Sequence, residues 1–329
     1  MQPTPGDVHV NTPLTNLSIA MIQQADNFIA TRVFPSVPTM KQSDRYYVYN
    51  RGDFNRDEME VRAPSTESHG SGYTLDNTPT YFANVYAIHK DVPDQVRGNA
   101  DSVLNVDREA LTFCVQKALI KREKVWATNY FATGVWTNEV AGVASAPSGA
   151  QRLQWNNSAS TPIEDVRKAK TVVLQSTGFV PNKLTLGRQV YDVLLDHPEV
   201  IDRIKYGQSG AGAPAMASRQ ALAGLFEVDE ILISNAIVNT AAEGLTANHS
   251  FIMGKHALLT YSPPAPGVMT PSAGYSFSWN GYLGAGPDGN RVKQFRMEHL
   301  ASDRVELEIA FDMKLVAADL GYFFNGIVA

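Results

Sequence analysis

The strongest pattern in the chain is an alternation of apolar and polar side chains near its carboxyl end. From Val305 to Leu315 every odd position is apolar, and the even positions are charged except for Ala310. Because successive side chains of a strand point to opposite faces, this period predicts a strand with one buried and one wet face. Residues Val292–Leu300 are expected to pair with it through a turn at Ala301-Ser302-Asp303.

A helical period marks residues Asp101–Phe131, where Val106, Ala110, Cys114 and Ala118 share one stripe. We predict one helix there, with charged side chains such as Glu123 at its polar positions. At about 1.5 Å per residue, about thirty residues would span about 45 Å. Cys114 is the only cysteine, and a lone thiol in an apolar stripe is expected to be a core residue.

Residues 161–290 alternate between short helical and strand signals, which indicates an α/β domain. Thr161-Pro-Ile-Glu164 predicts a capping box that opens a helix through about Gln175, with Gly178 at its carboxyl cap. Further helices are expected at 189–195, 199–205 and 218–225, and strands at 184–186, 228–233, 251–253 and 257–261. Gly207–Ala215 is predicted to be a mobile loop, and the glycine- and serine-rich residues 132–160 a surface connection.

Residues 41–93 contain two aromatic, strand-prone stretches, Arg45–Tyr49 and Thr80–Ile88. The segment between them is dense in charge, and a connection of this length is usually functional or disordered. We interpret it as a projecting two-stranded loop whose charges find partners only on another molecule. Residues 1–38 are interpreted as an arm that lies on another surface, with a helix from about Thr12 that ends before Pro35.

Composition narrows the class of protein. The chain has 329 residues, 44% hydrophobic and 19% charged, which supports a folded core. Its net charge of −5 argues against a dedicated nucleic-acid binder, because such a protein needs a basic excess to neutralise phosphates. No apolar run reaches the roughly 18 residues of a membrane span, so no membrane contact is expected.

No sequence motif in the chain gives a strong signal for catalysis, cofactor binding or metal binding. Gly284–Gly289 matches a dinucleotide-binding pattern, but the turn and strand expected after it lack the required helix. Gly207-Gln-Ser-Gly210 does not complete a nucleophile elbow. Asp192, Asp196 and His197 resemble a metal site, and a solvated helix end is the favoured interpretation. We therefore predict no catalytic, cofactor-binding or metal-binding residues, and no enzyme.

The order of these parts resembles the tailed-bacteriophage major capsid proteins of the Hong Kong 97-like fold, an α+β class. The segments that carry the resemblance are Val33–Pro38, Leu225–Asn235, Phe251–Ser262 and Leu320–Asn325. The implied parts are an amino-terminal arm (1–40), an extended β-loop (41–93), a peripheral domain with spine helix and connection (94–160), an axial domain (161–290), and the carboxyl-terminal strands of the peripheral β-sheet (291–329).

The resemblance implies a structural protein that self-assembles into hexamers and pentamers of an icosahedral head. The head would enclose double-stranded DNA, which the protein would contact weakly and non-specifically. It would reside in the virion capsid after assembly in the host bacterial cytoplasm. Expected partners are its own copies, a separate scaffolding protein, a portal protein and a decoration protein. A separate scaffold is expected because the arm helix begins by about Thr12. No lysine lies between Arg45 and His89, so covalent cross-linking from the loop is not expected.

Contact residues between subunits are predicted in two places. The loop offers ion-pair candidates, and the mobile loop of the axial domain offers glycines that would meet around a symmetry axis. These candidates are Arg51, Asp53, Arg56, Glu58, Glu60, Arg62, Gly207, Gly210 and Gly212. Two alternatives stay open: an encapsulin-like nanocompartment shell protein, and a cytosolic oligomeric α/β enzyme such as a hydrolase.

Overall fold

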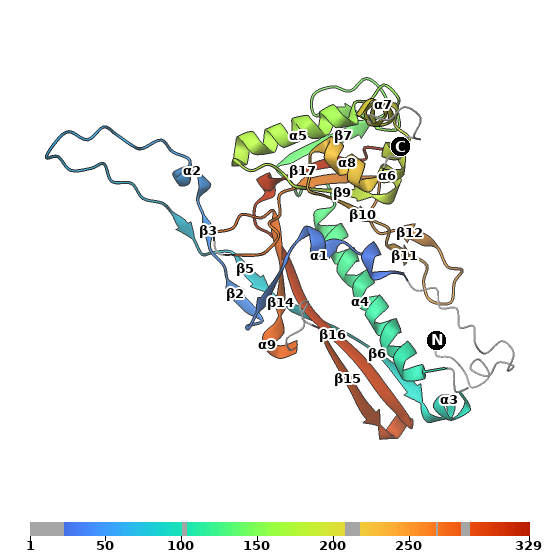
Figure 1. Cartoon of the computed structure of the whole chain (residues 1–329). Helices are drawn as coiled ribbons and strands as arrows, with labels where there is room; N and C mark the ends of the chain where they lie inside the picture. Colours follow the sequence, from blue (N-terminus) through green and yellow to red (C-terminus); the bar gives the residue numbers. More distant parts are fainter. Residues whose placement is uncertain (1–22, 101–103, 208–217, 268, 284–289) are drawn as a thin grey trace.

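The computed structural model describes residues 23–100, 104–207, 218–267, 269–283 and 290–329. Two sheet-centred units lie one above the other, and a long loop projects sideways from the region between them (Figure 1). The lower unit is an elongated five-stranded sheet crossed by one long helix, and the upper unit is a six-stranded sheet with several helices.

The five-stranded sheet is built around one long strand, β16. Its strand order is β1-β14-β16-β15, with β6 on the other side of β16. Only the β1–β14 pairing is parallel. The strands are β1 (Ser36–Thr39), β6 (Asn84–Pro93), β14 (Gly274–Trp279), β15 (Asn290–Met297) and β16 (Ser302–Leu315). The predicted pairing of the last two is confirmed, with η2 (Glu298–Leu300) and Ala301 between them.

The predicted wet face of β16 is wrong in part. The odd positions 305–313 are buried as expected, but Glu308 and Ala310 on the other face are only 7% and 0% exposed. The neighbouring strand β15 supplies the reason, because its cations cover the carboxylate. Arg291 Nε lies 3.1 Å from Glu308 Oε2, and Lys293 Nζ lies 2.7 Å from Glu308 Oε1.

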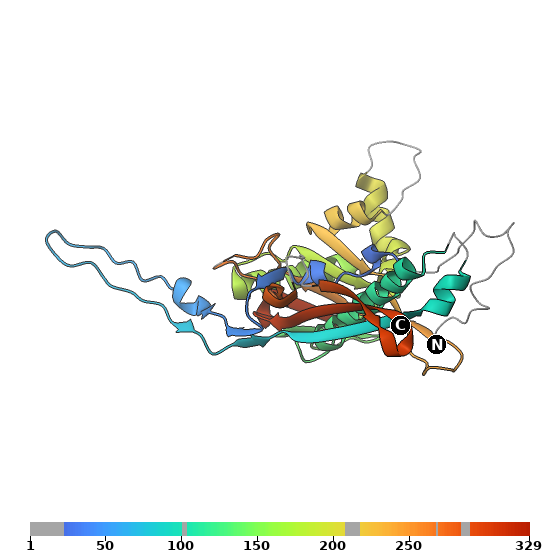
Figure 2. The ribbon, with the colours of Figure 1, turned by 90° about the horizontal axis from the view of Figure 1, so that it is seen from below.

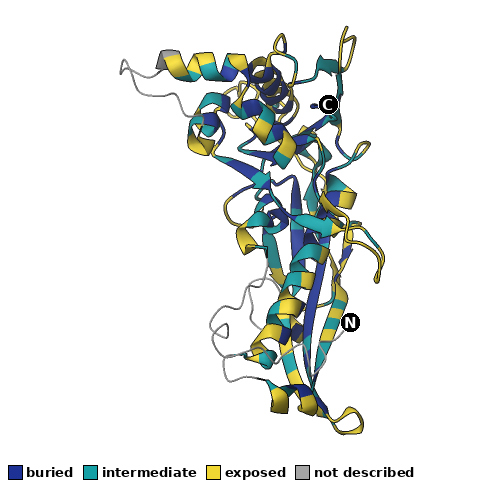
Figure 3. Ribbon diagram, turned by 90° about the vertical axis from the view of Figure 1, so that its right-hand side faces the viewer, coloured by how far each residue is buried: buried dark blue, intermediate teal, exposed yellow. Residues whose placement is uncertain are grey.

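The long helix is confirmed as α4 (Val106–Tyr130). Asn105 caps its start, since its side-chain oxygen accepts a hydrogen bond from Arg108 N at 3.0 Å. The helix packs on β6 and β16, and Cys114 is fully buried as predicted. Glu123, expected at a polar position, is instead 1% exposed. In Figure 3 the buried strand β16 runs beneath this helix.

The upper unit has the strand order β10-β9-β13-β17-β7-β8. Its strands are β7 (Asn138–Val143), β8 (Gln151–Leu153), β9 (Lys183–Gly187), β10 (Glu230–Ser234), β13 (Ala257–Thr260) and β17 (Gly321–Asn325). The expected surface connection at 132–160 is therefore wrong, because it supplies two strands and the fully buried Trp155. Strand β17, from the carboxyl-terminal segment, also belongs to this sheet.

The predicted helices of this unit are confirmed as α5 (Pro162–Thr177), α6 (Arg188–Leu195), α7 (Pro198–Gly207) and α8 (Arg219–Phe226). Gly178 takes the left-handed conformation at the end of α5, with φ of 80°. The predicted capping box is wrong, because Thr161 makes no side-chain cap. Glu199 of α7 accepts the hydrogen bond from Ile163 N instead, at 3.3 Å.

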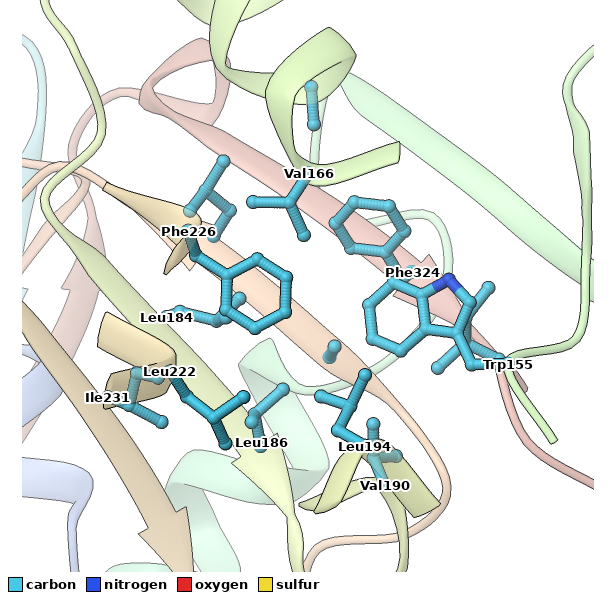
Figure 4. Packing of buried hydrophobic residues seen from close by; sticks show 14 of the residues in the cluster. Trp155, Val166, Leu184, Leu186, Val190, Leu194, Leu222, Phe226, Ile231 and Phe324 are labelled. Atoms are coloured by element: carbon cyan, nitrogen blue, oxygen red, sulfur yellow. The ribbon is translucent and has the colours of Figure 1, made fainter. Parts of the chain in front are cut away.

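Helices and sheet of the upper unit enclose one apolar core. Figure 4 shows Trp155, Val166, Leu184 and Phe324 converging between α5 and the strands. The expected strand at 251–253 is β12 (His249–Phe251), which pairs with β11 (Ile237–Asn239) and not with β13. Three further short elements outside the loop are α3 (Asp94–Asn99), α9 (Asn280–Leu283) and η3 (Ala318–Leu320).

Residues 24–39 correct the picture of an arm that lies on another surface. After η1 (Ala25–Asn27), helix α1 (Ala30–Val33) packs into the chain's own core, and Phe34 is fully buried. Strand β1 then joins the five-stranded sheet. The part of the predicted arm helix at 12–22 lies outside the described residues.

Candidate assembly surface

The most conspicuous surface feature is the segment 41–82, which we call the extended loop. It projects far from both sheets in two perpendicular views (Figures 1 and 2). Short antiparallel pairs hold its base: β2 (Ser43–Arg45) with β5 (Thr80–Phe82), and β3 (Val48–Tyr49) with β4 (Leu75–Asp76). The predicted strand 80–88 is thus split at Ala83, and β6 is a full member of the five-stranded sheet.

Aromatic and polar contacts anchor the base of the extended loop. Tyr81 stacks on Phe277 of β14, with ring centroids 4.5 Å apart. The amide of Phe82 donates a hydrogen bond to Asp312 Oδ2 at 2.8 Å. Arg51, in the short helix α2 (Arg51–Phe54), forms an ion pair with Asp319 of η3. The base is therefore fixed to the body at both limbs.

Farther out, the two limbs are held together by Asp53 and three rings. Asp53 Oδ2 accepts hydrogen bonds from Thr74 N at 2.9 Å and Thr74 Oγ1 at 2.7 Å, which hold the pKa of this carboxyl below its usual value. Tyr49, Phe54 and Tyr73 pack with ring centroids 5.3–6.1 Å apart. No β pairing continues beyond this point of the described loop.

The outermost part, residues 55–72, is what we call the loop tip. Apart from Glu58, every residue of the tip is exposed. Two of them are large and apolar: Met59 is 96% exposed and Val61 102%. An isolated two-stranded ribbon is marginally stable in water. The tip thus presents apolar side chains on a backbone outside any strand pairing, without a core beneath them.

The charged candidates of the loop are satisfied largely within the chain, which corrects the expectation that they find partners only on another molecule. Arg51 pairs with Asp319. Arg56 lies 3.3 Å from Asp53 and 3.3 Å from Glu58. Glu58 also accepts a hydrogen bond from the Ser71 hydroxyl, which lowers the pKa of its carboxyl.

The other loop candidates lie in the tip. Arg62 Nε donates to the Thr66 carbonyl at 2.5 Å, and Glu60 is exposed. Sequence reasoning missed Met59 and Val61, although two apolar side chains within a charged segment were a usable signal. Among the glycine candidates, Gly207 ends α7, whereas Gly210 and Gly212 lie outside the described residues, as does Gly284–Gly289.

The Asp192–Asp196–His197 group does not converge. Asp192 pairs with Arg188 at 2.7 Å, and Asp196 caps α6. His197 is not solvated, contrary to expectation: it is 3% exposed, and its Nε2 lies 3.0 Å from Ser160 Oγ. Within the described ranges, no cluster of three or more metal-ligating side chains is found.

In the same described residues, no helix is long and apolar enough to cross a membrane.

Residues 150–273 match the family model of phage major capsid protein E. Over nearly their whole lengths, two curated relatives resemble the chain. The major capsid protein of Burkholderia phage BcepMu is 24% identical, with 97% of this chain and 96% of that protein covered. The major capsid protein of Pseudomonas phage JBD67 is 25% identical, with 95% and 96% covered.

Solved structures share the fold. A phage-related protein of Bordetella bronchiseptica RB50 superposes with a TM-score of 0.69 at 21% identity, covering 93% of each chain. The mature capsid of bacteriophage PhiM1 gives 0.55 at 9% identity, with 98% of each chain covered. The SrpI encapsulin of Synechococcus elongatus also gives 0.55, at 13% identity, with 95% of this chain and 93% of that chain covered. The architecture is the Hong Kong 97-like α+β fold.

Proposed function

We infer that this chain is the major capsid protein of a tailed bacteriophage and that it acts by assembling with copies of itself into a virion capsid. The match to the capsid family and the likeness to two phage major capsid proteins along the whole chain support this function. An encapsulin shares the fold, but the sequence relatives are phage proteins. The same relatives favour a structural role over the alternative of an oligomeric hydrolase.

We propose that the extended loop is the main contact between neighbouring copies. The observation that supports this proposal most directly is the exposure of two apolar side chains on a limb with no core of its own. Met59 is 96% exposed and Val61 is 102% exposed. Burying such side chains is worth about 1.5–3 kcal/mol each. A cyclic ring uses head-to-tail contacts, in which a projection on one copy meets a different surface of the next. Hexamers and pentamers of this kind would close an icosahedral head around double-stranded DNA.

The remaining partners are proposals that rest on the family resemblance alone. They are a scaffolding protein, a portal protein and a decoration protein, with assembly in the host bacterial cytoplasm. The glycines near the end of α7 are likewise proposed to meet around the ring axis.

Electron microscopy and sedimentation velocity of the purified full chain test the proposed function. Closed shells or rings of five and six copies are expected. The double variant Met59→Ser/Val61→Ser should stay monomeric with an unchanged circular dichroism spectrum. The matched control is Leu245→Ser, which removes a 70% exposed apolar side chain elsewhere and should still assemble. A small dimer that turns over a substrate would contradict the capsid assignment, and normal shells from the double variant would contradict the loop contact.

A further inference from the structure

Four lysines form a continuous basic surface on the α4 side of the five-stranded sheet. Lys117, Lys121 and Lys124 follow one another at steps of four and three, so they share one face of the helix. Lys90 of β6 joins them, because its Nζ and that of Lys117 lie 5.4 Å and 5.3 Å from the centroid of the same Phe113 ring. We call these four residues the lysine stripe.

The lysine stripe is unusual because its charges are uncompensated. Within the described ranges, no salt bridge involves any of the four lysines, whereas most other cations there are paired. The acidic residues of α4 do not compensate them. Asp107 pairs with Arg97 at 2.7 Å, Glu123 is buried, and Glu109 stands in the first turn. Like charges at this spacing destabilise a helix slightly, so the stripe is not explained by stability.

The opposite side of the same sheet is different. There Arg291 and Lys293 lie 3.0 Å and 2.7 Å from Glu308, and Arg304 Nε lies 2.7 Å from Asp91. Among the described residues, the four lysines on one face of the sheet therefore have no salt-bridge partner, whereas Arg291, Lys293 and Arg304 on the other face are neutralised. In the wall of a shell, one face of a subunit meets the enclosed contents and the other face meets the surroundings. The difference in charge between the two faces of the sheet fits these two environments.

The chemistry of the stripe fits a phosphate backbone better than a protein surface. Lysine is depleted at protein–protein interfaces, whereas its flexible point charge suits non-specific contact with DNA phosphates. The aromatic rings beside the stripe already contact its own amines. Lys121 Nζ lies 5.0 Å from the centroid of the Tyr86 ring, and the Phe113 ring is shared by the amines of Lys90 and Lys117. The net charge of −5 on the whole chain would keep the contact local and weak.

We propose that the lysine stripe contacts the phosphates of the packaged double-stranded DNA, so that the α4 face lines the interior of the shell. This inference rests on the proposed capsid function, and it names the surface by which the wall meets its contents.

The test uses unassembled full-length subunits and a fluorescent 20-base-pair DNA duplex of random sequence, with binding measured by anisotropy at increasing salt. Each phosphate contact contributes about −0.9 to the slope of log affinity against log salt. The variant Lys117→Gln/Lys121→Gln/Lys124→Gln should therefore lower the steepness of the slope by about 2.7. The control Lys168→Gln/Lys205→Gln/Lys255→Gln removes the same charge from exposed sites elsewhere and should keep the slope.

An equal reduction of the salt slope in both triple variants would overturn the proposal, because any exposed lysine would then contact the DNA equally well. Loss of assembly with unchanged DNA binding would also overturn it and would assign the stripe to a protein contact. Formaldehyde cross-linking of DNA-filled wild-type particles gives a second readout that needs no variant: the stripe peptides should carry the DNA adducts. Failure of the wild type to form shells contradicts the capsid function separately, since the anisotropy measurement does not depend on assembly.

Discussion

Arg51 and Asp319 form an ion pair although 268 positions separate them in the chain. The pair joins α2 of the extended loop to η3 beside the upper sheet. It is half-buried, with side-chain exposures of 36% and 25%. Together with the Phe82–Asp312 hydrogen bond, it gives the loop a fixed direction of departure from the body.

Asp319→Asn should loosen the loop without unfolding the body. The ion pair is partly exposed, so its loss should cost about 1 kcal/mol or less of the free energy of unfolding. Trypsin should cleave after Arg56 and Arg62 several-fold faster than in the wild type. Asp192→Asn, which breaks the exposed pair with Arg188, serves as the control and should leave the cleavage rate unchanged.

Reversing the charge at Arg56 and Arg62 together should block closed-shell formation while the monomer stays folded. The two arginines have different surroundings in the structure. Arg56→Glu places a third carboxylate beside Asp53 and Glu58, so this single change should disturb the limbs of the loop. Arg62→Glu loses only the hydrogen bond to Thr66. Particle counts by electron microscopy should fall more for Arg56→Glu, and normal shells from the double variant would refute the role of the loop.

Glu123→Gln should remove a pH dependence of stability. Glu123 accepts hydrogen bonds from the amides of Ile29 and Ala30 and from the Ser234 hydroxyl at 2.9–3.0 Å, and burial raises its pKa from 4.5 to about 7. The folded state therefore binds more protons than the unfolded state between these values, and stability falls as the pH rises through this window. A glutamine can keep all three contacts without ionising.

Chemical denaturation at pH 5 and pH 8 measures this effect. The variant should gain up to about 3 kcal/mol over the wild type at pH 8 and little at pH 5. Glu164→Gln, at an exposed site, controls for the loss of one charge. A variant that is equally destabilised at both pH values would show that the carboxylate is needed for its hydrogen bonds alone.

Gly321→Ala should destabilise the fold severely. A Cβ at this position would lie 2.1 Å from Cε3 of Trp136, whose ring is buried in the core. Overpacking of this kind typically costs 1–3 kcal/mol or more, so the thermal midpoint should fall by several degrees. Gly224→Ala is the control, because nothing lies within 4 Å of the added Cβ and alanine favours the helix by about 0.5–1 kcal/mol.

Virions boiled in reducing detergent should release this chain only as a monomer. Between Arg45 and His89 the chain has no lysine that could form an amide bond to a neighbour, so the contacts of this part of the extended loop are expected to be non-covalent. Gel electrophoresis reads the result directly, and a ladder of higher bands would contradict it.

Local pattern alone determined the helices α4 to α8 and the pairing of β15 with β16. Apolar residues that recur every three or four positions, or at alternate positions, mark the side of a helix or strand that is buried. It also marked the extended loop as a segment without a core. Pattern could not assign residues 138–153 to the upper sheet, since their strand partner β17 lies about 180 positions away. Nor could it foresee that Glu308 and Glu123 are buried, because the cations and amides that compensate them arrive from other elements. Charge partners are set by distances in the folded chain, so only the structure showed that Arg51 and Arg56 of the loop are ion-paired. By contrast, the three lysines of α4 form no salt bridge with any described residue.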